Sequence, residues 1–334
     1  MKPKIIVDSD IPYIRGRLEP FAEVLYRSQF EFTPEEAHDA SALVIRTRTR
    51  CNADLLQGSS VRLIATATIG MDQFDLPWCQ AAGIETRNAP GCNAPAVAQY
   101  VWSLLLRTGF DPARHTLGIV GCGNVGSIVA RWGERLGARI LVSDPPKAER
   151  GELQYPDTPL ETLLRESDAV TLHVPMTREE PHATFHLIGE RELAMMRDSA
   201  WIINAARGPV ADNAALVKAI PEKHLKAIID TWEGEPAINT ELLRLAEIPT
   251  FHIAGYSAQG KQRATRMALE AVSQFFGWDI DISGLEGPYI EPEILTPEKI
   301  TASFDPQPIA DSLRRNPELF DRLRADYVFR DEVK

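Results

Sequence analysis

The stretch 116–144 constrains the fold of this chain more than any other part of the sequence. It begins with the apolar run 117–120, which is typical of a parallel strand buried on both faces. Gly121, Gly123 and Gly126 follow with the spacing G-x-G-x-x-G. The first glycine permits a sharp turn, the second a close approach of backbone to a pyrophosphate, and the third tight packing of the next helix on the strand. This order predicts a dinucleotide site; a glycine-rich turn in another kind of α/β protein is the alternative.

The helix and strand after this turn complete the pattern. Apolar residues at helical spacing predict a helix over 125–136, with its N-terminus directed at the pyrophosphate. A second apolar strand, 139–142, ends at Asp144, 18 residues after the last glycine. A carboxylate there can accept both ribose hydroxyls of NAD and would repel the 2′-phosphate of NADP. We therefore predict NAD as the cofactor, although Lys147 and Arg150 could favour NADP.

Strand-like runs alternate with helical stretches along most of the chain, which predicts parallel sheets covered by helices on both faces. We expect four strands before the glycine turn, at 4–7, 42–45, 61–65 and 84–86. Six more are expected at 117–120, 139–142, 169–175, 200–204, 226–230 and 250–253. Six strands make a complete doubly wound dinucleotide domain, so the predicted class is α/β with a Rossmann-type sheet.

Length and composition limit the number of domains and the kinds of partner. The 334 residues suffice for about two domains, each with its own core. A formal net charge of −11 argues against nucleic-acid binding, so an anionic substrate would need a local cluster of arginines. Apolar runs are far shorter than the roughly 18 residues of a membrane span, and acidic residues stand near the N-terminus where a signal peptide is apolar. We expect a cytoplasmic protein without membrane contact.

Cysteine and histidine spacing indicates neither a disulfide framework nor a metal site. The four cysteines have no C-x-x-C spacing. His182 and His186 stand four residues apart and could chelate a metal on a helix, but no third ligand is in view. We expect no metal ion.

The ends of three later strands carry groups that suit a nicotinamide enzyme. Arg207 lies in INAARGPV and Glu235 in IDTWEGEP. His252 is expected on the strand 250–253. An imidazole exchanges protons near neutral pH, a carboxylate can fix its tautomer, and a guanidinium can grip a substrate carboxylate. Taken singly, Arg207 is typical of a surface charge, Glu235 of a turn cap and His252 of a buried core residue. Their joint spacing instead predicts a set of catalytic residues.

The same residues stand in the motifs N-x-x-R-G, D-x-x-x-x-E-P and H-I-x-G, and with them the chain resembles the D-isomer-specific 2-hydroxyacid dehydrogenases along essentially its whole length. Further runs resemble a member that acts on a phosphorylated acid: IIVDSDIPY, ALVIRTRTRCN, IATATIGMDQFD, NAPGCNAPAVAQYV and HIAGYSAQGKQRAT. The resemblance implies NAD-dependent oxidation of a phosphorylated 2-hydroxy acid. A different acid, such as 3-phosphoglycerate, and a non-catalytic NAD(H)-sensing module are the alternatives.

The resemblance also implies roles for individual residues. Arg207 would bind and polarise the substrate carboxylate and 2-oxygen, and His252 would exchange a proton with Glu235 as its partner. Substrate contacts are implied at Thr47, Thr68 and Tyr256. Cofactor contacts are expected at Gly121, Gly123, Asn124, Val125, Gly126, Asp144, Val174, Asp230 and Gly255. Relatives often have threonine in place of Val174, so only a backbone or packing contact is expected there.

A phosphorylated substrate needs a cationic site, which alternating arginines could supply. Arg46, Arg48 and Arg50 point to one side if their segment is extended. A solvated basic edge is the alternative. Further candidates are Lys261 and a tail arginine of a second subunit, namely Arg322, Arg324 or Arg330.

The domain plan follows from the same resemblance. A flavodoxin-like substrate domain would comprise residues 1–98 and 258–284, and a Rossmann NAD domain residues 99–257, with the active site between them. The proline-rich and charged segment 285–334 has few core residues and resembles an added C-terminal dimerisation segment, which implies a homodimer.

Overall fold

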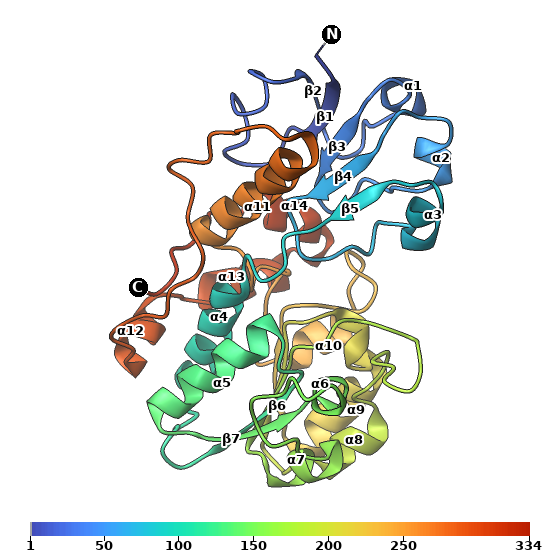
Figure 1. Cartoon of the computed structure of the whole chain (residues 1–334). Coiled ribbons are helices and arrows are strands. Elements are labelled where there is room, and N and C mark those ends of the chain that lie inside the picture. The colour runs from blue at the N-terminus through green and yellow to red at the C-terminus, as the bar shows by residue number, and fades with distance from the viewer. Residues whose placement is uncertain (1) are drawn as a thin grey trace. The chain divides into compact units, whose positions relative to one another are not determined.

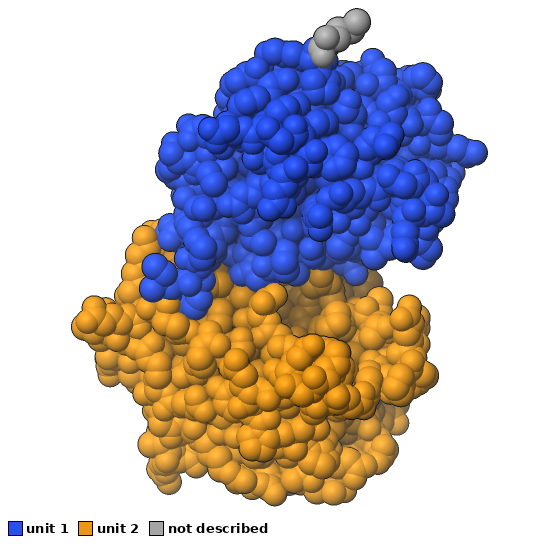
Figure 2. Space-filling model, in the orientation of Figure 1, with its two compact units in different colours: residues 1–93, 257–290 blue, residues 94–256, 291–334 orange. Residues whose placement is uncertain are grey.

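The structure is a computed structural model that describes residues 2–334. It divides into two compact units, which Figure 2 distinguishes by colour. Unit 1 comprises Met1–Asn93 and Ser257–Ile290, and unit 2 comprises Ala94–Tyr256 and Glu291–Lys334. Residues 291–334 of the C-terminal segment therefore belong to the same compact unit as the glycine turn, whereas residues 285–290 belong to unit 1.

Unit 1 is built on a five-stranded parallel sheet with the order β2-β1-β3-β4-β5. The strands are β1 Lys4–Asp8, β2 Glu23–Arg27, β3 Ala42–Ile45, β4 Leu63–Thr66 and β5 Glu85–Arg87. The helices are α1 Pro34–Ala37, α2 Ala53–Leu56, α3 Leu76–Ala81 and α11 Ala258–Phe276.

Successive side chains of these strands enter two different cores, as the two-residue period of a strand requires. Ile5 and Val7 of β1 pack with Leu269 of α11 in one core. Ile6 between them packs with Leu56 of α2 in the other. Figure 1 shows α11 on one side of this sheet and α2 and α3 on the other.

The sequence predicted four of the five strands and missed β2. Its sequence, EVLYR, starts with an exposed charge and is only half-buried, because it lies at the edge of the sheet. A half-buried edge strand has no continuous apolar run by which to recognise it.

Unit 2 contains a six-stranded parallel sheet with the order β11-β10-β9-β8-β6-β7. The strands are β6 Thr116–Val120, β7 Arg139–Ser143, β8 Ala169–Leu172, β9 Trp201–Asn204, β10 Lys226–Ile229 and β11 Ile248–Pro249. The helices are α4 Ala94–Arg107, α5 Asn124–Leu136, α6 Pro145–Glu149, α7 Leu160–Glu166, α8 Glu190–Met195, α9 Asn213–Lys223, α10 Thr240–Leu245, α12 Pro297–Ala302, α13 Gln307–Arg315 and α14 Phe320–Ala325, with 3₁₀ turns η1 Gly208–Val210 and η2 Pro317–Leu319. The predicted α/β class with a doubly wound parallel sheet is confirmed.

The direction in which successive strands are added to this sheet reverses at β6. From β6 the chain first adds β7 on one side and then crosses to β8 on the other. Such a reversal leaves a crevice beyond the carboxyl ends of the two central strands, where ligands of open α/β sheets bind. The glycine turn follows β6 and lies at this position.

The C-terminal segment packs on unit 2 through buried apolar side chains, including Ile300, Phe304, Leu313 and Phe320. Ser103 and Arg107 of α4 both donate to the carbonyl of Phe304, at 3.1 and 2.9 Å. Among residues 2–334, no helix has the length and apolar character needed to cross a membrane.

Candidate active site

The three predicted catalytic residues follow three neighbouring strands. Arg207 follows β9, Glu235 follows β10 and His252 follows β11, and these strands are parallel and adjacent in the sheet. Their carboxyl ends therefore share one edge, which brings segments far apart in the sequence into contact.

The Arg207 turn is shaped by Asn204, the last residue of β9. The Asn204 amide donates to the carbonyls of Arg207 and Gly208, at 3.0 and 3.2 Å. A Cβ on Gly208 would lie 2.0 Å from the Trp232 carbonyl oxygen, so only glycine permits this approach of the turns after β9 and β10. The N-x-x-R-G motif thus combines an asparagine that folds the turn with a glycine that packs it.

Glu235 and His252 form a close pair. The Nδ1 atom of His252 lies 2.8 Å from Oε2 of Glu235, and Oε1 of Glu235 accepts a hydrogen bond from the Trp232 amide at 2.8 Å. The pair is partly buried. With Nδ1 held by the carboxylate, Nε2 is the nitrogen that can exchange a proton with a bound substrate.

The electrostatics of this pair keep Glu235 ionised. Burial alone would raise the pKa of its carboxyl group, but the charge and hydrogen bond of His252 lower it, with help from the Trp232 amide. The charge of Arg324 adds to this effect, and the resulting pKa lies below the ordinary value of 4.5. A lowered pKa means that the stability contributed by the carboxylate is present above pH 4.5 and is lost as the pH falls through the lower folded-state pKa.

The structure corrects the predicted strand 250–253. β11 ends at Pro249, and His252 lies in a bend after it with a φ of 59°. A positive φ is uncommon for a residue with a side chain, and such conformations persist where surrounding contacts hold them. Asp230 supplies these contacts, because its carboxylate accepts hydrogen bonds from Ile253 N at 2.8 Å and Ala254 N at 3.0 Å.

The glycine turn has the shape that a pyrophosphate requires. A Cβ on Gly121, where φ is 88°, would lie 2.7 Å from the His173 carbonyl oxygen, and a Cβ on Gly126 would lie 2.0 Å from that of Gly121. A Cβ on Gly123 would meet no described atom within 4 Å. The first and third glycines therefore serve the fold, whereas the second leaves open the space that a pyrophosphate would fill.

This difference predicts opposite results for two alanine substitutions. Gly123→Ala should keep wild-type thermal stability, because its methyl group meets no described protein atom. It should weaken NADH binding, because the methyl group takes up space that the pyrophosphate would fill. We expect a loss of about tenfold or more, which corresponds to about 1.4 kcal/mol of binding free energy. Gly126→Ala should unfold at a lower temperature, because overpacking costs about 1–3 kcal/mol. Melting curves and NADH fluorescence titrations measure both properties. A destabilised Gly123→Ala with unchanged NADH affinity would contradict the assignment.

The Asp144 carboxylate makes hydrogen bonds within the protein that the sequence does not reveal. Its carboxylate accepts hydrogen bonds from the Cys122 amide at 2.7 Å and the Lys147 amide at 3.1 Å, so it caps α6 and fastens the glycine turn. The Lys147 ammonium group bonds the Cys122 carbonyl at 2.9 Å. A carboxylate oxygen can accept more than one hydrogen bond, so a ribose contact remains compatible with these bonds.

Asp144→Asn should narrow the preference for NAD over NADP. The amide oxygen can still accept one backbone hydrogen bond, whereas the repulsion of a 2′-phosphate and the charged ribose contact are lost. We expect the ratio of kcat/KM for the two cofactors to fall by about tenfold or more, because hydrogen bonds to charged groups contribute about 1.5–3 kcal/mol. An unchanged ratio in steady-state assays would place ribose recognition elsewhere.

The other predicted cofactor residues of unit 2 lie near the same edge of the sheet. Asn124 and Val125 are the first residues of α5, and Val174 follows β8 after His173. Gly255 lies in the turn after His252, where the Tyr256 amide donates to the Ile253 carbonyl at 2.8 Å. Tyr256, predicted to contact substrate, packs against the rings of Tyr327 and Phe329.

Unit 1 carries the remaining predicted substrate residues at the ends of two adjacent strands. Arg46 and Thr47 follow β3, and Thr68 follows β4. The Thr68 hydroxyl lies 2.7 Å from that of Thr66, and Arg46 lies 4.0 Å from Asp10.

The arrangement expected for Arg46, Arg48 and Arg50 does not hold. The chain bends at Thr47 and Arg48, so the segment is not extended and the side chains are not in simple alternation. The repeated R-T pattern gave no sign of this bend. The three arginines are therefore not shown to form one surface for a phosphate. Each of them individually remains a candidate phosphate ligand.

His182 and His186 lie outside helices and strands, so the helical spacing by which they could have chelated a metal does not occur. His182 pairs with Glu149 at 3.0 Å, and His186 pairs with Glu233 at 2.9 Å. His186, Asp212 and Glu233 bring possible ligand atoms within 4.8 Å of one another. Within this group, His186 hydrogen-bonds Glu233 and forms an ion pair with Asp212 at 3.7 Å.

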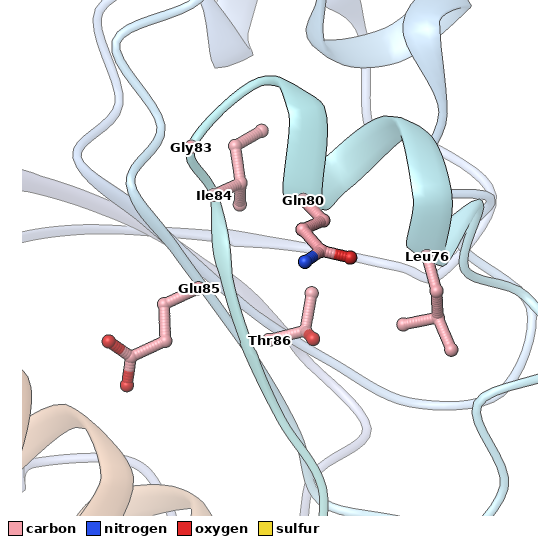
Figure 3. A pocket seen from close by; sticks show the side chains of 6 residues that line it. All are labelled: Leu76, Gln80, Gly83, Ile84, Glu85 and Thr86. Atoms are coloured by element: carbon pink, nitrogen blue, oxygen red, sulfur yellow. The ribbon is translucent and has the colours of Figure 1, made fainter.

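A surface hollow of about 410 Å³ lies between α3 and β5 in unit 1. Figure 3 shows Leu76 and Gln80 on the helix side, and Glu85 and Thr86 on the strand side. None of the predicted site residues lines it. It therefore adds nothing to the candidate active site.

Sequence reasoning missed the residues that hold the His252 segment in place. Thr250 donates to Asp230 at 2.6 Å, and Arg330 of the C-terminal segment bonds several carbonyls after His252. No local pattern marks either residue, because their partners are distant in the sequence. Arg330, predicted as one possible phosphate ligand, is thereby already engaged.

Comparison with known proteins agrees with this geometry. The family model described as "D-isomer specific 2-hydroxyacid dehydrogenase, NAD binding domain" matches residues 86–257. The erythronate-4-phosphate dehydrogenase of Bacteroides fragilis is 43% identical, with 98% of this chain and 97% of the relative aligned. That of Porphyromonas gingivalis is 41% identical over 99% and 94%, respectively. A crystal structure of D-lactate dehydrogenase from Aquifex aeolicus with NAD and lactic acid matches with a TM-score of 0.69 and 26% identity, covering 82% of this chain and 95% of the other. This chain therefore belongs to the D-isomer-specific 2-hydroxyacid dehydrogenases and uses NAD as its cofactor.

Proposed function

We propose that this protein oxidises 4-phospho-D-erythronate at C2 to 2-oxo-3-hydroxy-4-phosphobutanoate, a step of pyridoxal phosphate (vitamin B6) synthesis. The observation that carries the proposal is the near full-length similarity to erythronate-4-phosphate dehydrogenases, which extends through the segments bearing Arg207, Glu235 and His252. The close contact of Glu235 with His252 supports it, because the reaction needs a group that removes the hydroxyl proton.

In the proposed mechanism, bound NAD supplies the acceptor for the C2 hydride. His252 takes the C2 hydroxyl proton on Nε2, and Glu235 stabilises the imidazolium that results. Arg207 holds the substrate carboxylate and polarises the 2-oxygen with its forked N–H groups. The open space at Gly123 fits the cofactor pyrophosphate. The same groups in reverse would return the proton when a 2-oxo acid is reduced.

We extend the proposal to the remaining site residues. Tyr256 of unit 2, and Arg46, Thr47 and Thr68 of unit 1, would contact substrate. Arg324 is a further candidate for the phosphate, since its guanidinium carbon lies 5.5 Å from the centre of the Tyr256 ring. Asn124, Val125, Val174, Asp230 and Gly255 would contact the cofactor through backbone, packing or hydrogen bonds.

The substrate assignment is tested by measuring kcat/KM with 4-phospho-D-erythronate, 3-phospho-D-glycerate and D-lactate in parallel. A second series includes an oxo acid as electron acceptor, so that enzyme with retained NADH can turn over. A strong preference for 4-phospho-D-erythronate is expected. Preference for another acid would refute the proposed substrate but would leave the proposed hydride and proton transfer unaffected. Tight NADH binding without turnover of any acid would favour an NAD(H)-sensing module.

We also propose that the protein is a cytoplasmic homodimer joined through the C-terminal segment. That segment exposes large apolar side chains, with Val328 at 86% and Ile294 at 57% of full exposure. A partner subunit that covered these side chains would remove their apolar surface from water.

The dimer proposal predicts that Val328→Asp, alone or with Ile294→Asp, yields monomers in light scattering after size exclusion. These side chains are exposed within the chain, so the fold itself should survive. Phe30→Asp is the matched control, since Phe30 is 77% exposed but lies in unit 1. A double variant that remains dimeric would show that Val328 and Ile294 do not lie in the dimer interface.

A further inference from the structure

The segment after His252 is held on both sides by charged groups from different parts of unit 2. On one side, the Asp230 carboxylate accepts the Ile253 and Ala254 amides at 2.8 and 3.0 Å. On the other, the Arg330 guanidinium donates to the carbonyls of Ile253 and Tyr256, at 3.0 Å each, and to that of Ala254. The N–H groups of this turn thus meet an anion, and its C=O groups meet a cation.

Arg330 is itself fixed from several directions. It donates to the carbonyl of Ala96 in α4 at 2.9 Å and to the Tyr327 hydroxyl at 3.3 Å. Its guanidinium carbon lies 4.7 Å from the centre of the Phe304 ring. The guanidinium is planar and presents its donors in a rigid fork, so it can hold several carbonyls in one fixed geometry.

Asp230 is fixed in a corresponding way. The Thr250 hydroxyl donates to it at 2.6 Å, and Tyr100 lies 2.8 Å from Thr250. Because Thr250 has a single hydroxyl hydrogen, Tyr100 must be the donor in the second bond. Burial raises the pKa of Tyr100 well above its ordinary value, so its hydroxyl remains protonated.

We propose that Arg330 is a positioning residue for the reaction: from the C-terminal segment, it fixes the turn 253–256 and thereby the orientation of His252 toward Glu235. The C-terminal segment would then contribute to catalysis within its own chain, independently of any part in dimer formation. This inference rests on the proposed role of His252.

The mechanism of this effect is geometric. His252 has a φ of 59°, a conformation that an isolated histidine seldom adopts, and its neighbours on the C-terminal side are the residues that Arg330 binds. Without the guanidinium, the Ala254 and Tyr256 carbonyls lose this donor, the Ile253 carbonyl keeps the Tyr256 amide, and the turn can relax. A displacement of about 1 Å at a reacting group can lower turnover about 100-fold.

The test compares Arg330→Ala and Arg330→Lys with Arg314→Ala in the full-length protein. Arg314 is the matched control, since it is also a C-terminal arginine that binds two backbone carbonyls, those of Ala246 and Glu247, but not the turn after His252. For Arg330→Ala we expect kcat to fall by about 10- to 100-fold, with a smaller change in KM and in NADH affinity. Arg330→Lys should lie between it and wild type, because an ammonium group cannot reproduce the fork.

Three readouts separate positioning from general destabilisation. Added guanidinium ion at non-denaturing concentration should restore part of the turnover of Arg330→Ala but not alter Arg314→Ala. The acid limb of the pH profile should move to higher pH in Arg330→Ala, because a loosened contact with His252 lowers the pKa of the Glu235 carboxyl group less. Light scattering should show the wild-type oligomeric state. If Arg330→Ala does not fold, Arg330→Lys carries the comparisons of kcat, pH profile and oligomeric state.

Wild-type kcat in Arg330→Lys and Arg330→Ala would overturn the inference, as would equal losses in Arg314→Ala. His252→Asn, assayed beside them, distinguishes failure of the Arg330 positioning role from failure of the His252 proton-transfer role. Loss of turnover in His252→Asn with none in the Arg330 variants would refute only the positioning. Full turnover in His252→Asn would refute the proposed proton-transfer role of His252, on which the inference rests.

Discussion

Replacing His252 with asparagine should lower kcat for 4-phospho-D-erythronate oxidation by about 10²- to 10⁴-fold, the usual contribution of general acid–base catalysis. Asparagine is the suitable substitute because it tolerates the positive φ of this position better than alanine does. Its amide can also still donate to Glu235. The loss would then report the missing imidazole rather than a rearranged turn.

NADH affinity and the melting temperature are the controls for this variant. Both should stay close to wild type, because His252 lies after β11 whereas the glycine turn lies after β6. Turnover within a few-fold of wild type would refute proton transfer by His252. A parallel loss of NADH binding would instead indicate a disturbed fold.

Replacing Arg207 with lysine should lower kcat/KM by about 10²- to 10³-fold, comparable to the loss of a group that stabilises developing charge. Lysine keeps the positive charge but offers no fork for a carboxylate and an adjacent oxygen. The backbone should tolerate the change, since Asn204 and Gly208 shape the turn. The Arg207 guanidinium also donates to the adjacent Ala206 carbonyl at 2.8 Å, a bond that a lysine ammonium group can still offer.

Arg191→Lys is the matched control, because Arg191 is an exposed arginine of α8 with surface ion pairs. It should retain wild-type kinetics. If Arg207→Lys behaved in the same way, Arg207 would serve as a charge only, and bidentate substrate binding would have to be abandoned.

The fold was predictable wherever a local pattern reflected the burial of a whole element. Buried parallel strands such as β3 and β6 are continuous apolar runs, and the glycine turn has a spacing imposed by close contacts at Gly121 and Gly126. The three motifs around Arg207, Glu235 and His252 were also visible, because each turn is short and local.

What the sequence could not provide depends on contacts between distant residues. The edge strand β2 is half-buried and lacks an apolar run. The strand assignment at His252 was wrong because the Asp230 carboxylate, rather than a neighbouring strand, binds the amides that follow it. Arg330 could be counted as a charge, but its carbonyl partners could be found only in three dimensions.

The central claim is that the chain moves the C2 hydrogen of 4-phospho-D-erythronate to NAD. Its most direct test is a single turnover with substrate deuterated at C2, followed by quenching and mass spectrometry of all NADH, whether released or retained. The account predicts NADH that carries the deuterium in wild type, and strongly slowed formation of it in His252→Asn. Undeuterated NADH, or deuterated NADH formed equally fast by His252→Asn, would contradict it.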